Sequence, residues 1–240
     1  MVKAIIADDL TGAMDAGVQV LGQAPATVEV QARDAHSKPA SHNAIRIINT
    51  QTRDANANTA AERVRATCQR LCAQGQTPWF KKIDSTLRGN IGAELRALHA
   101  ALNPCLVICT PALPAERRTV ESGVLKIAGQ EVFYTPYRDE TANTDTKANR
   151  SAVKDIIRKQ WPECRVRNLT RLVKSNDILS ALQETVDLLI VDASRPGDLA
   201  GFRNRLDRKR LIAVIFRQRH DQGAVAMADI VAHKSLDLGP

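Results

Sequence analysis

Short apolar segments alternate along this 240-residue chain with longer amphipathic segments, and this alternation limits the fold more than any other feature. Eight segments are short and apolar or alternating, as expected of strands: 3–7, 26–32, 44–49, 78–83, 105–110, 165–169, 186–192 and 211–216. Helical spacing is found in seven others: 11–22, 58–73, 92–102, 151–159, 176–184, 199–206 and 223–233. Strands that alternate with helices form βαβ units, so we expect a three-layer α/β fold with a mostly parallel central sheet in a single domain.

The domain is expected to span residues 1–220, with a C-terminal helix or tail over 221–240. The N-terminal apolar run is only four residues long, too short for a signal peptide, and no stretch approaches 18 apolar residues. We therefore expect a cytoplasmic protein with no membrane partner. The five cysteines suit a reducing compartment; their spacing could indicate zinc, but no second half completes a zinc site, so we expect core packing and no metal.

The net charge of +8 is concentrated in residues 151–220, which carry 15 basic and 8 acidic side chains. Such a block can bind nucleic acid, a membrane surface or an anionic substrate, or it can be a solvated face. No aromatic residue interleaves with the Arg-rich run 203–210, so base stacking has little support. We interpret the block as a solvated face and expect no nucleic-acid partner.

In a parallel sheet, ligands bind outside the carboxyl ends of the strands, so the residues that follow each strand are the first candidates for a site. Asp8 and Asp9 follow the first expected strand, and Thr11 opens the helix after it as its expected cap. Adjacent carboxylates cannot both enter an apolar core. One of them could cap the helix; otherwise they bind a substrate hydroxyl or act as a general base.

Two further loops carry arginines at strand ends. Arg53 follows the strand that ends near Asn49, where its guanidinium could bind a carboxylate or phosphate, or form a surface salt bridge with Asp54. Arg118 projects from a proline-rich loop, 111–119, which alone is a weak signal.

The most informative segment is 81–92, KKIDSTLRGNIG, which places two lysines, an acid, two hydroxyls and an arginine within eight positions before a helix. The backbone N–H groups of that helix, together with Arg88 and the lysines, are expected to bind an anion. Asp84 could accept a hydroxyl proton or orient a lysine. The chain has no Walker A motif, no G-x-G-x-x-G after its first strand and no G-x-S-x-G.

Four motifs, IADDLTGAMDAG, NTQTRDA, KKIDSTLRGNIGAEL and PALPAERR, resemble in order and spacing the N-terminal, substrate-binding domain of the four-carbon acid sugar kinase family. The resemblance covers residues 3–206. Family members phosphorylate threonate, erythronate or 3-oxo-tetronate with ATP. By this resemblance the sugar-acid pocket is lined by Asp8, Asp9, Thr11, Arg53, Lys82, Asp84, Ser85, Arg88 and Arg118. The family has Asn-Gly-Arg where this chain has Glu116-Arg117-Arg118, so the turn there loses its glycine.

What the resemblance implies is the acceptor half of a kinase. Arg53, Lys82 and Arg88 would hold the substrate carboxylate and the transferring phosphate, and Asp9 or Asp84, with Asp9 preferred, would accept the hydroxyl proton. Family members carry ATP with Mg²⁺ on a second domain, which is expected here to be missing or to be a separately encoded partner. Turnover by this chain alone, a homo-oligomer and a non-catalytic role as a sugar-acid binding module are all left open.

Overall fold

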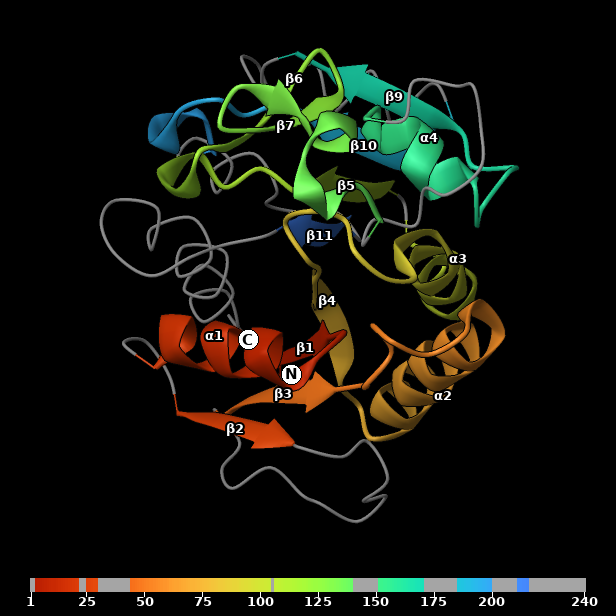
Figure 1. Ribbon diagram of the computed structural model, residues 1–240. Coiled ribbons are helices and arrows are strands. Elements are labelled where there is room, and N and C mark those ends of the chain that lie inside the picture. Colours follow the sequence, from red (N-terminus) through yellow and green to blue (C-terminus); the bar gives the residue numbers. More distant parts are fainter. Residues whose placement is uncertain are drawn as a thin grey trace.

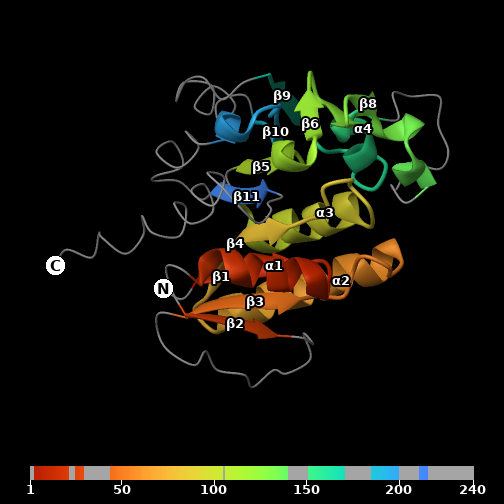
Figure 2. The ribbon, with the colours of Figure 1, turned by 60° about the vertical axis from the view of Figure 1, so that its left-hand side comes forward.

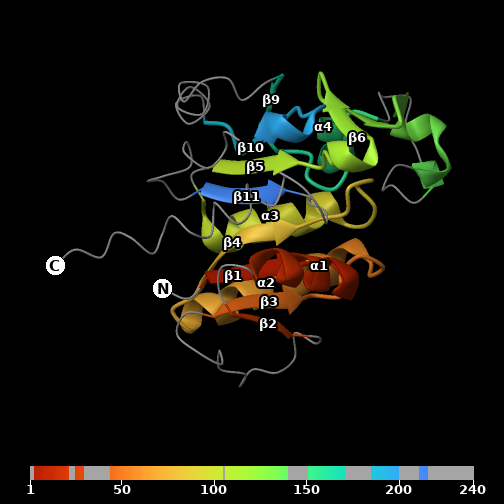
Figure 3. The ribbon, with the colours of Figure 1, turned by 90° about the vertical axis from the view of Figure 1, so that its left-hand side faces the viewer.

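The computed structural model describes residues 3–21, 25–29, 44–104, 106–139, 151–170, 185–199 and 211–215. Its centre is an eight-stranded sheet in which all of the paired strands run parallel (Figure 1). In spatial order the strands are β2 (Ala26–Glu29), β3 (Ile45–Asn49), β1 (Lys3–Ala7), β4 (Thr77–Lys82), β11 (Leu211–Ile215), β5 (Leu106–Thr110), β10 (Leu188–Val191) and β9 (Val166–Leu169). Figures 2 and 3 show these strands stacked from β2 to β9.

Helices lie on both faces of this sheet (Figure 1). On one face lies α1 (Leu10–Val20), and on the other are α2 (Ala57–Ala73), α3 (Ile91–Leu102) and α4 (Val153–Arg158). Successive strand residues point to opposite faces, so Ile5 and Ala7 of β1 join the core under α1, while Ala4 and Ile6 join the core under α2 and α3. The three-layer, single-domain α/β fold with a parallel sheet is therefore confirmed.

Most expected elements are present with small shifts of their ends. The expected strand 26–32 is observed as β2 up to Glu29, and the first helix begins at Leu10 rather than Thr11. The expected helix 199–206 is represented in the described residues only by the 3₁₀ turn η4 (Pro196–Leu199). The expected helices 176–184 and 223–233, and the boundary at residue 220, lie outside the described residues.

A second, antiparallel sheet was not predicted. It consists of β6 (Arg118–Glu121), β7 (Val124–Ile127) and β8 (Gln130–Glu131), and 3₁₀ turns η1 (Pro114–Glu116), η2 (Val132–Tyr134) and η3 (Pro136–Asp139) flank it. Strands of two to four residues are too short to give a readable alternation. A bridge between Val120 and Ala193 joins this sheet to the chain just after β10, so β6 lies at the carboxyl edge of the central sheet.

Of the four cysteines among the described residues, three occupy the core as expected, and Cys105 lies outside those residues. Cys68, Cys109 and Cys164 are buried, whereas Cys72 is exposed on the outer face of α2. Burial raises the pKa of the Cys109 thiol to about 12, which keeps it protonated. Within the described ranges, no helix is long and apolar enough to cross a membrane, and no group of three His, Cys, Asp or Glu residues could hold a metal ion.

Candidate functional site at the carboxyl edge of the sheet

The two aspartates after β1 have different roles. Asp9 caps α1: its Oδ1 accepts a hydrogen bond of 2.7 Å from the backbone N–H of Gly12. Thr11, the cap expected from the sequence, lies instead exposed in the first turn. Asp8 is 1% exposed and takes no part in capping, so its charge needs another partner.

That partner is Arg53. Its Nε and Nη2 donate to the two carboxylate oxygens of Asp8 at 2.9 and 3.0 Å, and its Nη1 donates to Asp9. The salt bridge considered with Asp54 is not formed, because the guanidinium turns inward. Burial lowers the pKa of Arg53, but Asp8, with Asp9 and Asp84 beyond it, outweighs this, and the net direction is upward. Two sequence-distant loops thus meet in a charged, bidentate contact.

Backbone hydrogen bonds also hold the loops after β1 and β3 against each other. The N–H groups of Thr52 and Arg53 donate to the carbonyl of Asp8 at 2.8 and 3.2 Å. Asn90 donates its side-chain N–H to the carbonyls of Thr52 and Ala55 at 2.9 and 2.6 Å. A Cβ at Gly89, whose φ is +93°, would lie 3.0 Å from the carbonyl oxygen of Arg53. The loop after β4 therefore lies directly against the loop after β3.

Lys82, the last residue of β4, extends its side chain toward the cluster formed by Asp8, Asp9 and Arg53. It is 3% exposed, and its Nζ lies 3.9 Å from the carboxylate of Asp15 on α1. Burial lowers the pKa of Lys82, against the opposing effect of Asp15, Asp8 and Asp84. A Cβ at Gly12 would lie 2.7 Å from Asp9 Oδ1 and 3.3 Å from Lys82 Cγ, so a side chain there would displace the capping carboxylate and press on the lysine.

Asp84 orders the loop that follows Lys82. Its Oδ2 accepts from the hydroxyl of Thr86 and from the backbone N–H groups of Thr86 and Arg88, the latter two at 3.3 and 3.4 Å. Burial raises the pKa of Asp84, but the Thr86 hydroxyl, Arg53 and Arg88 together lower it below the ordinary value. Asp84 therefore stays ionised at neutral pH.

Arg118 is the first residue of β6, which lies beside the carboxyl end of β10. Its Nη1 donates to the hydroxyl of Ser85 and lies 3.3 Å from Glu116, and its guanidinium sits 6.0 Å from the ring centroid of Tyr137. Arg117, in the place of the family's glycine, has φ +59° and ends η1. The turn is thus formed without glycine, by an arginine in the left-handed region.

One expected feature of the site is wrong. The first N–H groups of α3 do not face an open anion site, because Gly92 N–H and Ala93 N–H donate to Oε1 of Gln160 at 3.0 and 3.3 Å. This side chain from the end of α4 occupies the helix N-terminus.

The sequence analysis also missed a pair of residues. Lys81 was expected, together with Lys82 and Arg88, to bind an anion, but its Nζ lies 2.5 Å from Oε2 of Glu94 on α3, and both side chains are fully buried. The available signal was the doublet Lys81-Lys82 inside a strand: neighbouring strand residues face opposite sides, so both faces of β4 carry a charge.

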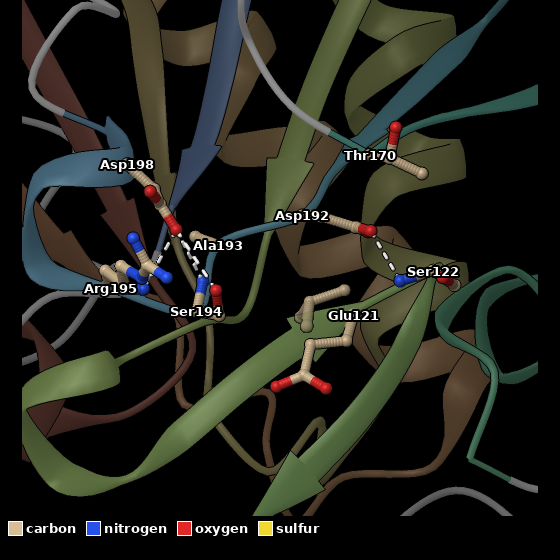
Figure 4. Close-up of a pocket in the computed structure, with 9 residues that line it drawn as sticks. Glu121, Ser122, Thr170, Asp192, Ala193, Ser194, Arg195 and Asp198 are labelled. Carbon is tan, nitrogen blue, oxygen red and sulfur yellow. Dashed lines mark hydrogen bonds between the residues drawn. The ribbon is translucent and has the colours of Figure 1, made fainter.

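A separate hollow of about 300 Å³ lies at the ends of β9 and β10, and the close-up shows its lining (Figure 4). Its charged lining residues are Glu121, Asp192, Asp198 and Arg195, and Asp192 accepts from the N–H groups of Ser122 and Gly123. Three strands of the sheet separate β10 from β1, and none of the residues expected at the site lines this hollow.

Comparison with known proteins agrees with the motifs. A family model described as a sugar-binding N-terminal domain matches residues 3–218. D-threonate kinase of Salmonella typhimurium is 33% identical over 198 residues, which are 81% of this chain and 46% of that enzyme. 3-Oxo-tetronate kinase of the same organism is 35% identical over 146 residues, 59% of this chain and 34% of that enzyme. The chain therefore spans less than half the length of these curated relatives.

Solved structures share the fold. A domain of unknown function from Bordetella bronchiseptica, crystallised with bound citrate as a domain-swapped dimer, superposes with a TM-score of 0.77 at 26% identity. The match covers 96% of this chain and 55% of that one.

The conformation of Arg117 gives a first prediction. Left-handed backbone costs a non-glycine residue about 1 kcal/mol or more, and Arg117 is exposed, so its side chain contributes little. We expect Arg117→Gly to raise the free energy of unfolding in urea by up to about 1 kcal/mol. Arg117→Ala is the control and should leave stability within about 0.5 kcal/mol of the parent; equal gains in both variants would show that the charge, not the φ angle, matters.

The buried contact of Arg53 gives a second. Arg53→Met leaves the carboxylate of Asp8 buried without its partner and should cost about 3–5 kcal/mol of unfolding free energy. Adding Asp8→Asn removes the stranded charge and should restore most of the loss. Arg96→Met, which removes an exposed arginine paired with Glu163, should change stability by less than about 1 kcal/mol. A similar loss in Arg53→Met and Arg96→Met would contradict the contact.

Proposed function

Because this chain belongs to the family of sugar-binding N-terminal domains of four-carbon acid sugar kinases, we propose that it binds a four-carbon sugar acid for phosphorylation by ATP. The observation that carries the proposal is the convergence of Asp8, Asp9, Arg53, Lys82 and Asp84 at one edge of the sheet. Threonate, erythronate and 3-oxo-tetronate each combine a carboxylate with hydroxyls, which cations and carboxylates can bind respectively. Citrate in the Bordetella structure is likewise a small hydroxy acid.

The surroundings of the three arginines support different tasks for them. Arg53 is already held by two aspartates and is best suited to organise the site. Arg88 is the most exposed cation of the cluster, with 39% of its side chain accessible, followed by Arg118 at 21%. We therefore place the substrate carboxylate nearest Arg88 and Arg118, with Lys82 and the buried Ser85 beneath and Thr11 as a hydroxyl partner at the rim.

For the proton acceptor, the geometry favours Asp84 over Asp9. Both oxygens of Asp9 are engaged, one by Gly12 and one by Arg53. In the described part of the chain, the contacts of Asp84 fall on Oδ2, so Oδ1 remains for a substrate hydroxyl. Phosphoryl transfer depends mostly on positioning and charge neutralisation, so a carboxylate of low pKa suffices to orient the hydroxyl. In this proposal the nucleotide that supplies the phosphoryl group is bound by a second domain or a partner chain.

A non-catalytic sugar-acid binding module remains the second candidate, because the chain covers less than half of the related kinases. Release of ADP, measured with D-threonate and ATP, separates the two. We expect no turnover by the chain alone and turnover when a nucleotide-binding partner chain is added. Absence of turnover even with the partner chain would favour the binding module. Turnover by the chain alone would contradict the proposal that the nucleotide site lies on another domain or chain.

Calorimetry tests the binding site itself. Titration with D-threonate or D-erythronate should release heat, and Arg88→Met should weaken binding about 10- to 100-fold, as expected when a charged hydrogen bond worth about 1.5–3 kcal/mol is lost. Arg96→Met, on the outer face of α3, is the matched control and should bind as the parent does. Absence of heat with every four-carbon acid would refute the substrate class.

A further inference from the structure

Gln160 lies outside the four motifs and outside the proposed binding site, yet its side-chain amide contacts two neighbouring groups of the molecule. Its Oε1 accepts from the backbone N–H groups of Gly92 and Ala93 at the start of α3, at 3.0 and 3.3 Å. Its Nε2 donates to Oδ1 of Asn90 at 3.3 Å. The next residue, Trp161, is 4% exposed and packs in the core, so the Gln160 side chain leaves from a fixed point.

Asn90 connects Gln160 to the loop after β3. Its Nδ2 donates to the carbonyls of Thr52 and Ala55 at 2.9 and 2.6 Å, and these two residues lie on either side of Arg53 in the sequence. In the same loop, the backbone N–H groups of Thr52 and Arg53 donate to the carbonyl of Asp8. Two sets of hydrogen bonds therefore hold the backbone around Arg53, one to Asp8 and one to Asn90.

The partners at each end fix the orientation of both amides. The N–H groups of α3 require an acceptor, so the oxygen of Gln160 faces them and its NH₂ group faces Asn90. The carbonyls of Thr52 and Ala55 require donors, so the NH₂ group of Asn90 faces them and its oxygen faces Gln160. Asn90 is 7% exposed, so water does not readily replace a contact that is lost there.

The same contacts link two cations of the proposed site. Asn90 lies two residues after Arg88, the arginine that we place nearest the substrate carboxylate. Its hydrogen bonds to the loop after β3 join the segment that carries Arg88 to the segment that carries Arg53. The relative placement of the two guanidinium groups thus depends on the amide of Asn90, and the orientation of that amide depends on Gln160.

We propose that Gln160 and Asn90 are positioning residues: Gln160 fixes the amide of Asn90, and Asn90 holds the segments of Arg53 and Arg88 in the arrangement that binds the sugar acid. This inference rests on the proposed function for its substrate readout only. The arrangement of Arg53 itself can be measured without any ligand.

The substitution Gln160→Glu separates this positioning role from helix capping. A carboxylate still accepts from the N–H groups of α3, and the positive end of the helix favours its charge. Its second oxygen, however, meets Oδ1 of Asn90 with no proton between them, so this contact is lost. Lys159→Gln is the matched control, because it also lowers the net charge by one, at the exposed position next to Gln160.

Two quantities are measured in the full chain: D-threonate affinity by calorimetry, and hydrogen exchange of Arg53 Nε–H by ¹⁵N NMR, with the signal assigned by its loss in Arg53→Lys. In the parent this N–H is hydrogen-bonded to Asp8 at 2.9 Å and should exchange slowly with water. The backbone amides of β5, in the sheet away from this loop, report the stability of the whole domain.

We expect Gln160→Glu to weaken D-threonate binding about 3- to 10-fold, as for one lost neutral hydrogen bond, and to speed exchange of Arg53 Nε–H more than that of the β5 amides. Lys159→Gln should change neither. Parent-like affinity or parent-like Arg53 exchange in a folded Gln160→Glu chain, an equal change in Lys159→Gln, or a uniform rise in exchange that includes β5 would overturn the proposal.

A second variant covers a failure to fold. If Gln160→Glu does not fold, Gln160→Met, which removes both amide contacts without adding a charge, must show the same two effects. If the parent binds no four-carbon acid, the proposed function fails, and the exchange of Arg53 Nε–H still decides the positioning role.

Discussion

The contact between Arg53 and Asp8 is the interaction on which the rest of the site depends. Asp8 directly follows the central strand β1 and is buried, so its charge requires a partner that can enter the edge of the sheet. A guanidinium meets this need because its planar fork binds both carboxylate oxygens while a third N–H remains for Asp9. That contact brings the loop after β3 over the end of β1, and the loop after β4 then packs on it through Asn90.

The two faces of the central sheet also differ chemically at this site. Because side chains alternate along β4, Lys82 faces α1 and Asp15 whereas Lys81 faces α3 and Glu94. One charge belongs to the binding cluster and the other lies beneath it. Charges placed on both faces of a central strand oppose apolar packing, and proteins commonly retain such departures from a uniform core at functional sites.

The sequence was sufficient for the architecture and for choosing candidate residues that meet at one edge of the sheet, but not for the contacts that those residues make. Alternating strands and helices predict the parallel sheet, and the strand-end rule selects Asp8, Arg53 and Asp84, which the structure brings together at one edge. Whether Arg53 pairs with Asp54 or Asp8, and which side chain occupies the N-terminus of α3, depend on contacts between segments tens of residues apart. Gln160, which caps α3 from 68 positions away, has no local signature. The small antiparallel sheet escaped prediction because its strands are too short to show a period.

We propose that the edge formed by β1, β3 and β4 binds the sugar acid, and a crystal structure of the chain with D-threonate would show this binding site directly. The account predicts the ligand carboxylate within hydrogen-bond distance of Arg88 or Arg118 and a ligand hydroxyl against Oδ1 of Asp84, with the Arg53–Asp8 contact intact beneath. Threonate bound instead in the hollow beside Asp192, with the cluster around Arg53 unoccupied, would contradict it.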